Sequence, residues 1–108
     1  MKAAVFKQVG KPLQVESVAD PVPREDGLVV KVAYCGVCGT DLHATREGLT
    51  TACCDQILGH EYVGEVVEVG RHAEGDWQPG DRVCAMPFIA CGHCLPCAAG
   101  RFFECQDK

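Results

Sequence analysis

Cys91-Gly92-His93-Cys94-Leu95-Pro96-Cys97 is the stretch that most constrains this structure, and Cys105 follows it after seven intervening residues. The C-x2-C-x2-C-x7-C spacing suits zinc, which prefers four thiolates in a tetrahedron at about 2.3 Å. Each C-x2-C step lets two sulfurs face one point, and a loop through Gly100 brings Cys105 back to close the site. All four positions would be filled by protein. The pattern therefore predicts a structural zinc lobe over residues 91–105, with no bound water to activate.

Two other interpretations of this cysteine cluster stay open. Iron–sulfur sites also use C-x2-C-x2-C runs, although this run lacks the x3-C-P continuation of bacterial ferredoxins. The cysteines could also be free thiols that cluster by chance. His93 is a candidate fifth ligand, but an exposed loop residue is the simpler interpretation of it.

The composition fits one small cytoplasmic domain. A domain of 108 residues has a core of modest stability, so a bound metal would help it. Nine cysteines, in a chain whose N-terminus has no signal-peptide pattern, indicate metal ligands before disulfides. The net charge of -5 argues against nucleic acid and anionic membranes as partners, and no apolar run approaches the roughly 20 residues that span a bilayer. We therefore expect a cytoplasmic protein that binds no nucleic acid and no membrane.

The residues before the cysteine cluster have the pattern of a mainly β fold. Short runs of β-branched or alternating residues are separated by turns rich in glycine and proline, which favours a small, partly open β-barrel. A short helix is expected over residues 40–46, with Thr40 or Asp41 near its start. No period of either kind follows Cys91. The expected strands cover residues 2–9, 13–18, 28–35, 62–69 and 82–88.

A second group of metal-ligating residue types lies earlier in the chain. The segment Tyr34-Cys35-Gly36-Val37-Cys38-Gly39-Thr40-Asp41-Leu42-His43 is followed by Gly59-His60-Glu61. A catalytic zinc has fewer protein ligands than a structural one, and its open position accepts water or substrate. A cysteine, a histidine and a carboxylate from these two segments fit such an open site.

Four motifs in order resemble the medium-chain, zinc-dependent alcohol and polyol dehydrogenases. Those enzymes carry a G-x-C-x-[ST]-D-x-H segment, then G-H-E, then G-D-R-V, and then four clustered cysteines. The matching stretches here are residues 36–43, 59–61 and 80–83, followed by the cysteine cluster. The resemblance covers nearly the whole chain. It implies a GroES-like β-barrel domain, which in the complete enzyme is joined to a Rossmann domain.

The resemblance also implies a ligand set for an open zinc site. Cys38 and His60 correspond to two ligands of the catalytic zinc. Glu61 corresponds to a nearby carboxylate, which ligates zinc directly in some members and sits close behind it in others. Asp41 corresponds to a group that orients a ligand such as His60 by accepting its free ring N–H.

The catalytic roles implied by the resemblance fall on Thr40 and His43. Zinc lowers the pKa of a bound alcohol, the Thr40 hydroxyl accepts the alcohol proton, and His43 carries the proton to water. The hydride then passes to NAD or NADP. The implied partners are a small-molecule alcohol and, for the full-length enzyme, further copies of itself in a homo-oligomer. Gly39 is similar to the residue that polyol and threonine dehydrogenases have at this position.

Two parts of such an enzyme are missing from these residues. The family's third protein ligand of the catalytic zinc lies further along than Lys108, and no G-x-G-x-x-G dinucleotide fingerprint follows a strand. We therefore interpret residues 1–108 as a GroES-like catalytic-domain segment without its cofactor-binding Rossmann domain, inactive by itself. The alternative is a stand-alone, zinc-stabilised structural or interaction module without catalysis. The closed cysteine cluster fits both interpretations.

Four further cysteines match no ligand position in these motifs. Cys35 and Cys84 are expected to be small buried residues within strands. Cys53 and Cys54 are expected to lie in a loop without a role as a pair.

Overall fold

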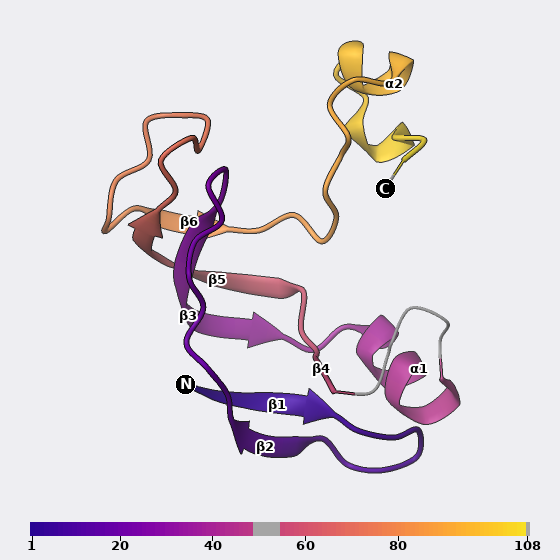
Figure 1. Cartoon of the computed structure of the whole chain (residues 1–108). Helices are drawn as coiled ribbons and strands as arrows, with labels where there is room; N and C mark the ends of the chain where they lie inside the picture. The colour runs from indigo at the N-terminus through magenta and orange to yellow at the C-terminus, as the bar shows by residue number, and fades with distance from the viewer. Residues whose placement is uncertain (49–54, 108) are drawn as a thin grey trace.

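The computed structural model describes residues 1–48 and 55–107, and these form two three-stranded antiparallel sheets (Figure 1). Sheet A has the strand order β2-β1-β4 and sheet B the order β3-β5-β6. The strands of sheet A are β1 (Lys2–Phe6), β2 (Gln14–Ser17) and β4 (Gln56–Ile57). Those of sheet B are β3 (Leu28–Gly36), β5 (Glu61–Val69) and β6 (Arg82–Cys84).

Sheet A fixes the segment that leads to Gly59-His60-Glu61. β1 and β2 form a hairpin, and β4 pairs with the end of β1 through Val5 and Phe6, both of which are buried. The Lys7 ammonium group lies 2.6 Å from a carboxylate oxygen of Asp55 and 3.0 Å from one of Glu16. These two carboxylates, Asp55 first, raise the pKa of Lys7. The exposed ion pairs thus tie the start of β4 to the rest of the sheet.

Sheet B is built on the long pair β3–β5. Its ladder runs from Leu28 opposite Val69 to Gly36 opposite Glu61, and two register shifts along this ladder, one with an extra residue in β5 and one with an extra residue in β3, bend the sheet. Gly64 sits beside one of these shifts, where a Cβ atom would collide with the Lys31 carbonyl group. Val66 is the one described side chain that is completely buried.

Helix α1 (Gly39–Glu47) begins directly after β3. Cys38 is its N-cap, and the Asp41 carboxylate accepts a hydrogen bond from the Cys38 amide at 2.9 Å. This contact satisfies one of the free N–H groups at the start of the helix. Gly48 ends the helix in the left-handed conformation (φ 74°), which glycine adopts without a Cβ clash. The β3–α1 junction therefore has a defined geometry.

The C-terminal lobe stands apart from both sheets at the end of an extended segment (Figure 1). It contains helix α2 (Leu95–Ala98) and the 3-10 helix η1 (Phe102–Glu104). Its buried side chains are Pro96, Cys97 and Cys105, so sulfur makes up much of its small core. The edge of the Phe88 ring packs against the Phe103 ring at a centroid distance of 5.2 Å and ties the extended segment to the lobe.

The mainly β, partly open architecture expected from the sequence is confirmed, with three local differences. The last expected strand, residues 82–88, ends at Cys84, and Pro87 could not donate a hydrogen bond to a longer ladder. β4 was not expected at all. Cys35 and Cys84 are exposed, not buried, because the described residues leave much of sheet B uncovered. The expectation for Cys53 and Cys54 lies outside the described residues.

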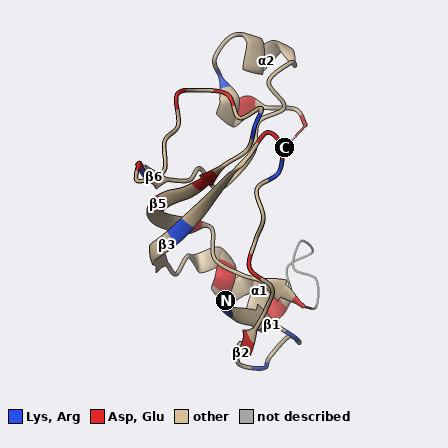
Figure 2. Ribbon diagram, turned by 60° about the vertical axis from the view of Figure 1, so that its left-hand side comes forward, with Lys and Arg blue, Asp and Glu red and all other residues tan. Residues whose placement is uncertain are grey.

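Charged residues are interspersed over the described parts of the chain. Figure 2 shows acidic and basic positions in both sheets and in the lobe. Among the described helices, none has the length and apolar character that crossing a membrane would require.

Candidate metal centres

The four sulfurs of the cysteine cluster converge in the lobe. The Sγ atoms of Cys91, Cys94, Cys97 and Cys105 all lie within 4.8 Å of one another. A tetrahedral zinc with bonds of about 2.3 Å would separate its sulfurs by about 3.8 Å. The Sγ atoms of Cys91 and Cys97 are 3.9 Å apart. The spacing of this donor set therefore fits one tetrahedral ion.

Local backbone geometry turns the four side chains inward. Cys94 is the N-cap of α2, so Cys94 and Cys97 lie within a single helical turn. Gly100 (φ 73°) then reverses the chain toward η1 and Cys105. Backbone amides point at the sulfurs: the Cys91 and Asp107 amides donate to Cys105 Sγ at 3.3 and 3.4 Å, and the Cys94 amide donates to Cys91 Sγ at 3.4 Å.

The surroundings of the four sulfurs in the lobe differ in how well they stabilise negative charge. Backbone amides of Gln106 and Cys97 lower the pKa of the Cys94 thiol to about 6. Burial, together with the neighbouring Cys94, raises the pKa of Cys97 to about 12. Zinc binds thiolates, and a divalent cation would offset the cost of holding negative charge on a buried sulfur such as that of Cys97. The chemistry of the donor set therefore also fits a bound metal.

His93 stays outside this donor group. Its Nδ1 atom lies 2.8 Å from the Cys91 carbonyl oxygen and donates a hydrogen bond to it. Its side chain is exposed, as the simpler interpretation of the sequence had it.

The structure brings together a second donor group beside the start of α1. Donor atoms of Cys38, His60 and Glu61 lie within 4.8 Å of one another. Cys38 comes from the β3–α1 junction, His60 from the segment after β4, and Glu61 from the first position of β5. Cys38 and His60 are half-buried and Glu61 is exposed. Three convergent donors leave a position open on one side, unlike the closed cluster in the lobe.

Two residues of α1 flank the His60 ring on opposite sides. An Asp41 carboxylate oxygen lies 3.6 Å from His60 Nδ1, while the other accepts the Cys38 amide. The Thr40 hydroxyl lies 3.2 Å from His60 Nε2. Because Nδ1 faces a carboxylate, Nε2 is the ring nitrogen available to a metal. Asp41 thus contacts two of the three residues that supply donors.

His43 is less closely tied to this group than the resemblance implies. Its Nδ1 atom lies 3.0 Å from Glu47, one turn further along α1, and its side chain is 56% exposed. Within the described part of the chain, the His43 ring forms a hydrogen bond with Glu47 and none with Thr40. His43 therefore lies at the solvent side of the helix.

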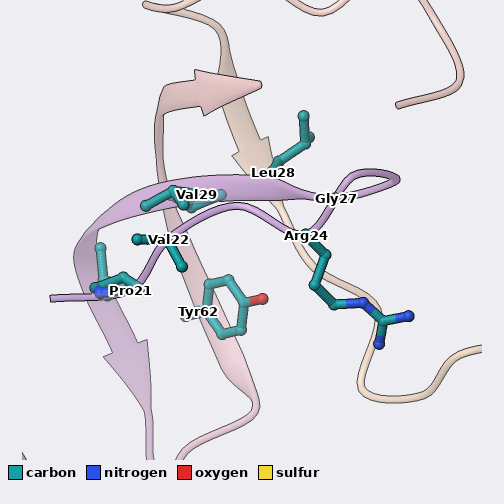
Figure 3. Close-up of a pocket in the computed structure, with 9 residues that line it drawn as sticks. Pro21, Val22, Arg24, Gly27, Leu28, Val29 and Tyr62 are labelled. Carbon is teal, nitrogen blue, oxygen red and sulfur yellow. The ribbon is translucent and has the colours of Figure 1, made fainter. Parts of the chain in front are cut away.

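An apolar cavity of about 330 Å³ lies elsewhere, against β3 (Figure 3). Its lining includes Pro21, Val22 and Tyr62. Tyr62 follows Glu61, and consecutive strand residues point to opposite faces of a sheet. None of the cavity's lining residues is a donor of either metal group.

Comparison with known proteins identifies the family. The profile of the alcohol dehydrogenase GroES-like domain matches residues 24–108. The chain belongs to this family. The membership agrees with the fold described above and with the resemblance that the sequence motifs carry. The chain is therefore a zinc-type alcohol dehydrogenase-like domain.

Individual relatives of this GroES-like domain are longer proteins. The chain is 39% identical over 104 residues to the uncharacterized zinc-type alcohol dehydrogenase-like protein YdjJ of Escherichia coli, covering 93% of this chain and 30% of that protein. It is 37% identical over 117 residues to the L-threonine 3-dehydrogenase of Xanthomonas euvesicatoria pv. vesicatoria, covering 99% of this chain and 32% of that enzyme. The chain thus spans about a third of the length of these relatives.

A solved structure shares the fold as well as the sequence. A zinc-binding dehydrogenase from Sinorhizobium meliloti, bound to NADP, superposes with a TM-score of 0.82 and is 40% identical. The match covers 98% of this chain and 30% of that one.

Proposed function

We propose that this chain is the zinc-binding, substrate-activating portion of an NAD- or NADP-dependent alcohol or polyol dehydrogenase. The convergence of Cys38, His60 and Glu61 within 4.8 Å carries this proposal. Contacts of Thr40 and Asp41 with the His60 ring support it. A purely structural module has no need of a three-donor group that leaves one side open.

The two donor groups have different roles in this proposal. The four cysteines form a closed set that holds a structural zinc and orders the lobe. Cys38, His60 and Glu61 form the substrate-side set. The Asp41 carboxylate faces His60 Nδ1 at 3.6 Å, so it favours the tautomer that keeps the proton on Nδ1 and leaves Nε2 available to the metal.

The Thr40 hydroxyl handles the alcohol proton. A zinc ion in the open group would supply Lewis acidity that lowers the pKa of an alcohol oxygen. When His60 Nε2 is engaged by the metal, the Thr40 hydroxyl loses its present neighbour and is available to the alcohol. It accepts the alcohol proton and donates its own onward. His43, whose ring is 56% exposed, exchanges protons with water.

The hydride acceptor requires a part of the enzyme beyond these residues. The 108 residues contain no G-x-G-x-x-G fingerprint, and the matched relatives are about three times as long. We propose that a Rossmann domain in the complete, homo-oligomeric cytoplasmic enzyme holds the nicotinamide, and that residues 1–108 alone form the catalytic-domain segment. The NADP bound to the Sinorhizobium relative supports this proposal.

Metal counting tests the two-centre proposal. After loading with zinc, the chain is expected to hold two ions, and a mild chelator should remove only the one bound by the open group. The variant Cys38→Ser should lose the chelator-sensitive ion. Cys35→Ser is the matched control, because Cys35 is exposed and lies outside both donor groups. A chelator-sensitive ion that survives in Cys38→Ser would refute the open site, and iron with visible absorbance would refute zinc in the lobe.

A stand-alone zinc-stabilised module is the second candidate function. The lobe favours it, because the lobe stands apart from the sheets and has a core rich in its own cysteines. Loss of the chelator-sensitive ion in Cys38→Ser would favour the dehydrogenase, because a structural module would need only the ion in the lobe.

A further inference from the structure

Gly36 and Glu61 face each other where sheet B meets the open donor group. Gly36 is the last residue of β3, Glu61 is the first residue of β5, and the two are direct cross-strand partners. Directly opposite side chains in an antiparallel pair have Cβ atoms only about 4.5–5.5 Å apart. A side chain at position 36 would therefore compete with Glu61 for the same space.

The Glu61 side chain occupies that space. A Cβ atom built on Gly36 would lie 2.7 Å from Glu61 Oε2 and 3.3 Å from Glu61 Cβ. The first distance is shorter than a van der Waals contact, so the carboxylate would have to move. Gly36 is not among the described glycines with a positive φ. Its backbone therefore suits any residue, and the missing side chain is what distinguishes it.

The folded-over position of Glu61 is the one that brings it to the donor group. Glu61 is exposed and could extend its carboxylate into solvent, yet a carboxylate oxygen lies within 4.8 Å of the donor atoms of Cys38 and His60. The same side chain has Oε2 above Gly36. The empty volume above Gly36 is thus the route by which this long side chain reaches the metal ligands.

We propose that Gly36 is a positioning residue, whose missing side chain lets Glu61 serve as the third donor of the open metal site. This inference rests on the proposed function, because it requires that site to bind metal. It gives a physical role to Gly36, which in the sequence is only the first residue of the G-x-C-x-[ST]-D-x-H segment.

Cobalt binding tests the proposal without measuring activity. The four-cysteine site of the full 108-residue chain is first filled with one equivalent of zinc, and Co²⁺ is then titrated while its visible absorption is followed. Gly36→Ala is expected to weaken Co²⁺ binding at the second site about 10- to 100-fold, the range typical when a residue that orients a ligand is changed. Glu61→Ala is expected to weaken it at least as much.

Gly39→Ala is the matched control. Gly39 is also close to Cys38 and has no positive φ, but a Cβ built on it meets nothing within 4 Å. Its Co²⁺ affinity is expected to equal that of the unmodified chain. In the Glu61→Ala background, Gly36→Ala should cause no further loss, because the carboxylate it displaces is already gone.

The outcomes distinguish failure of the proposed metal site from failure of the Gly36 inference alone. If the unmodified chain binds no Co²⁺ beyond the zinc-filled lobe, the open metal site is refuted and the inference with it. Unchanged binding in Gly36→Ala overturns the inference alone. So does a further loss in the Glu61→Ala background, or faster amide exchange in β3 and β5 of metal-free Gly36→Ala, since either would show that the substitution disrupts the sheet.

Discussion

At the scale of single residues, Asp41 connects the start of helix α1 to His60, a candidate metal ligand. One of its oxygens accepts the Cys38 amide, and the other faces the His60 ring. Its side chain is only 17% exposed, which limits competition from water. The same carboxylate therefore lies against both residues, and in the proposed function it orients the His60 ring. Asp41 therefore both caps helix α1 and lies beside the ring of a candidate metal ligand.

Thr40→Ala in the complete enzyme is expected to lower turnover about 100- to 10,000-fold, the usual contribution of a group that transfers protons. Zinc content should stay unchanged, because Thr40 is not one of the three donors. The measurements are kcat and zinc per chain. Thr45→Ala is the control, since the Thr45 hydroxyl donates hydrogen bonds to the helix carbonyl groups of Asp41 and Leu42 and is not one of the candidate donors. Near-normal turnover in Thr40→Ala would remove Thr40 from the mechanism.

At the scale of elements, the sheets and the lobe are stabilised by different means. The sheets bury apolar side chains such as Val5, Phe6 and Val66. The lobe buries Cys97 and Cys105, and its short helical turns carry little apolar core. Because unfolded chains lack a preformed metal site, the free energy of binding metal becomes free energy of folding for such a lobe.

Cys94→Ser is expected to expose the backbone of residues 91–105 while leaving sheets A and B as protected as before. The physical reason is that loss of one thiolate weakens metal binding, on which the lobe depends and the sheets do not. Amide hydrogen exchange measures both regions in one experiment. Cys84→Ser is the control, because Cys84 is exposed and lies outside both donor groups. Equal protection of the lobe in both variants would contradict the expectation.

Patterns that are local in sequence predicted most of the helices and strands, but not which faces of the strands are covered by other residues. The β-branched run in β3 and the alternation in β5 located both strands, and the cysteine spacing located the lobe. β4 has two residues, too few to show a period. Burial of Cys35 and Cys84 was wrong because alternation does not tell whether anything covers a face.

For the candidate site too, the sequence motifs predicted some of the residues and missed others. Cys38, His60 and Glu61 were expected from motif resemblance, and the structure brings their donor atoms together, while metal binding there stays a prediction. The contact of His43 with Glu47 follows from helical i, i+4 spacing and competes with the expected relay. Gly36 was overlooked as a candidate, because its partner Glu61 is set by strand register over a long separation in sequence.

At the scale of the whole molecule, the described residues hold candidate metal sites but no recognised means of positioning a dinucleotide. Hydride transfer requires the reacting atoms to be held about 3–3.5 Å apart. The matched relatives have about three times this length, which allows a further domain for that task. The proposed activity therefore requires the metal-binding residues described here and a further domain that holds the nicotinamide.

Residues 1–108 alone are expected to form no NADH or NADPH from any alcohol, even when loaded with zinc. The physical reason is that nothing in this sequence is expected to hold the nicotinamide beside the alcohol carbon. Absorbance of the reduced cofactor gives the measurement, with a complete zinc-type dehydrogenase of the family as the positive control. Alcohol-dependent reduction of NAD or NADP by the pure 108-residue chain would contradict the proposal that a further domain holds the nicotinamide.

The open architecture also affects how the isolated chain behaves in solution. Large apolar side chains are exposed to water in both sheets and in the lobe: Val15 of sheet A is 73% exposed, Tyr34 of sheet B 79% and Phe103 of the lobe 69%. Contiguous apolar surface promotes self-association, and kosmotropic salts such as sulfate strengthen that tendency. We therefore expect self-association to limit the concentration at which the isolated chain stays dispersed, with the repulsion from its net charge of -5 acting against it.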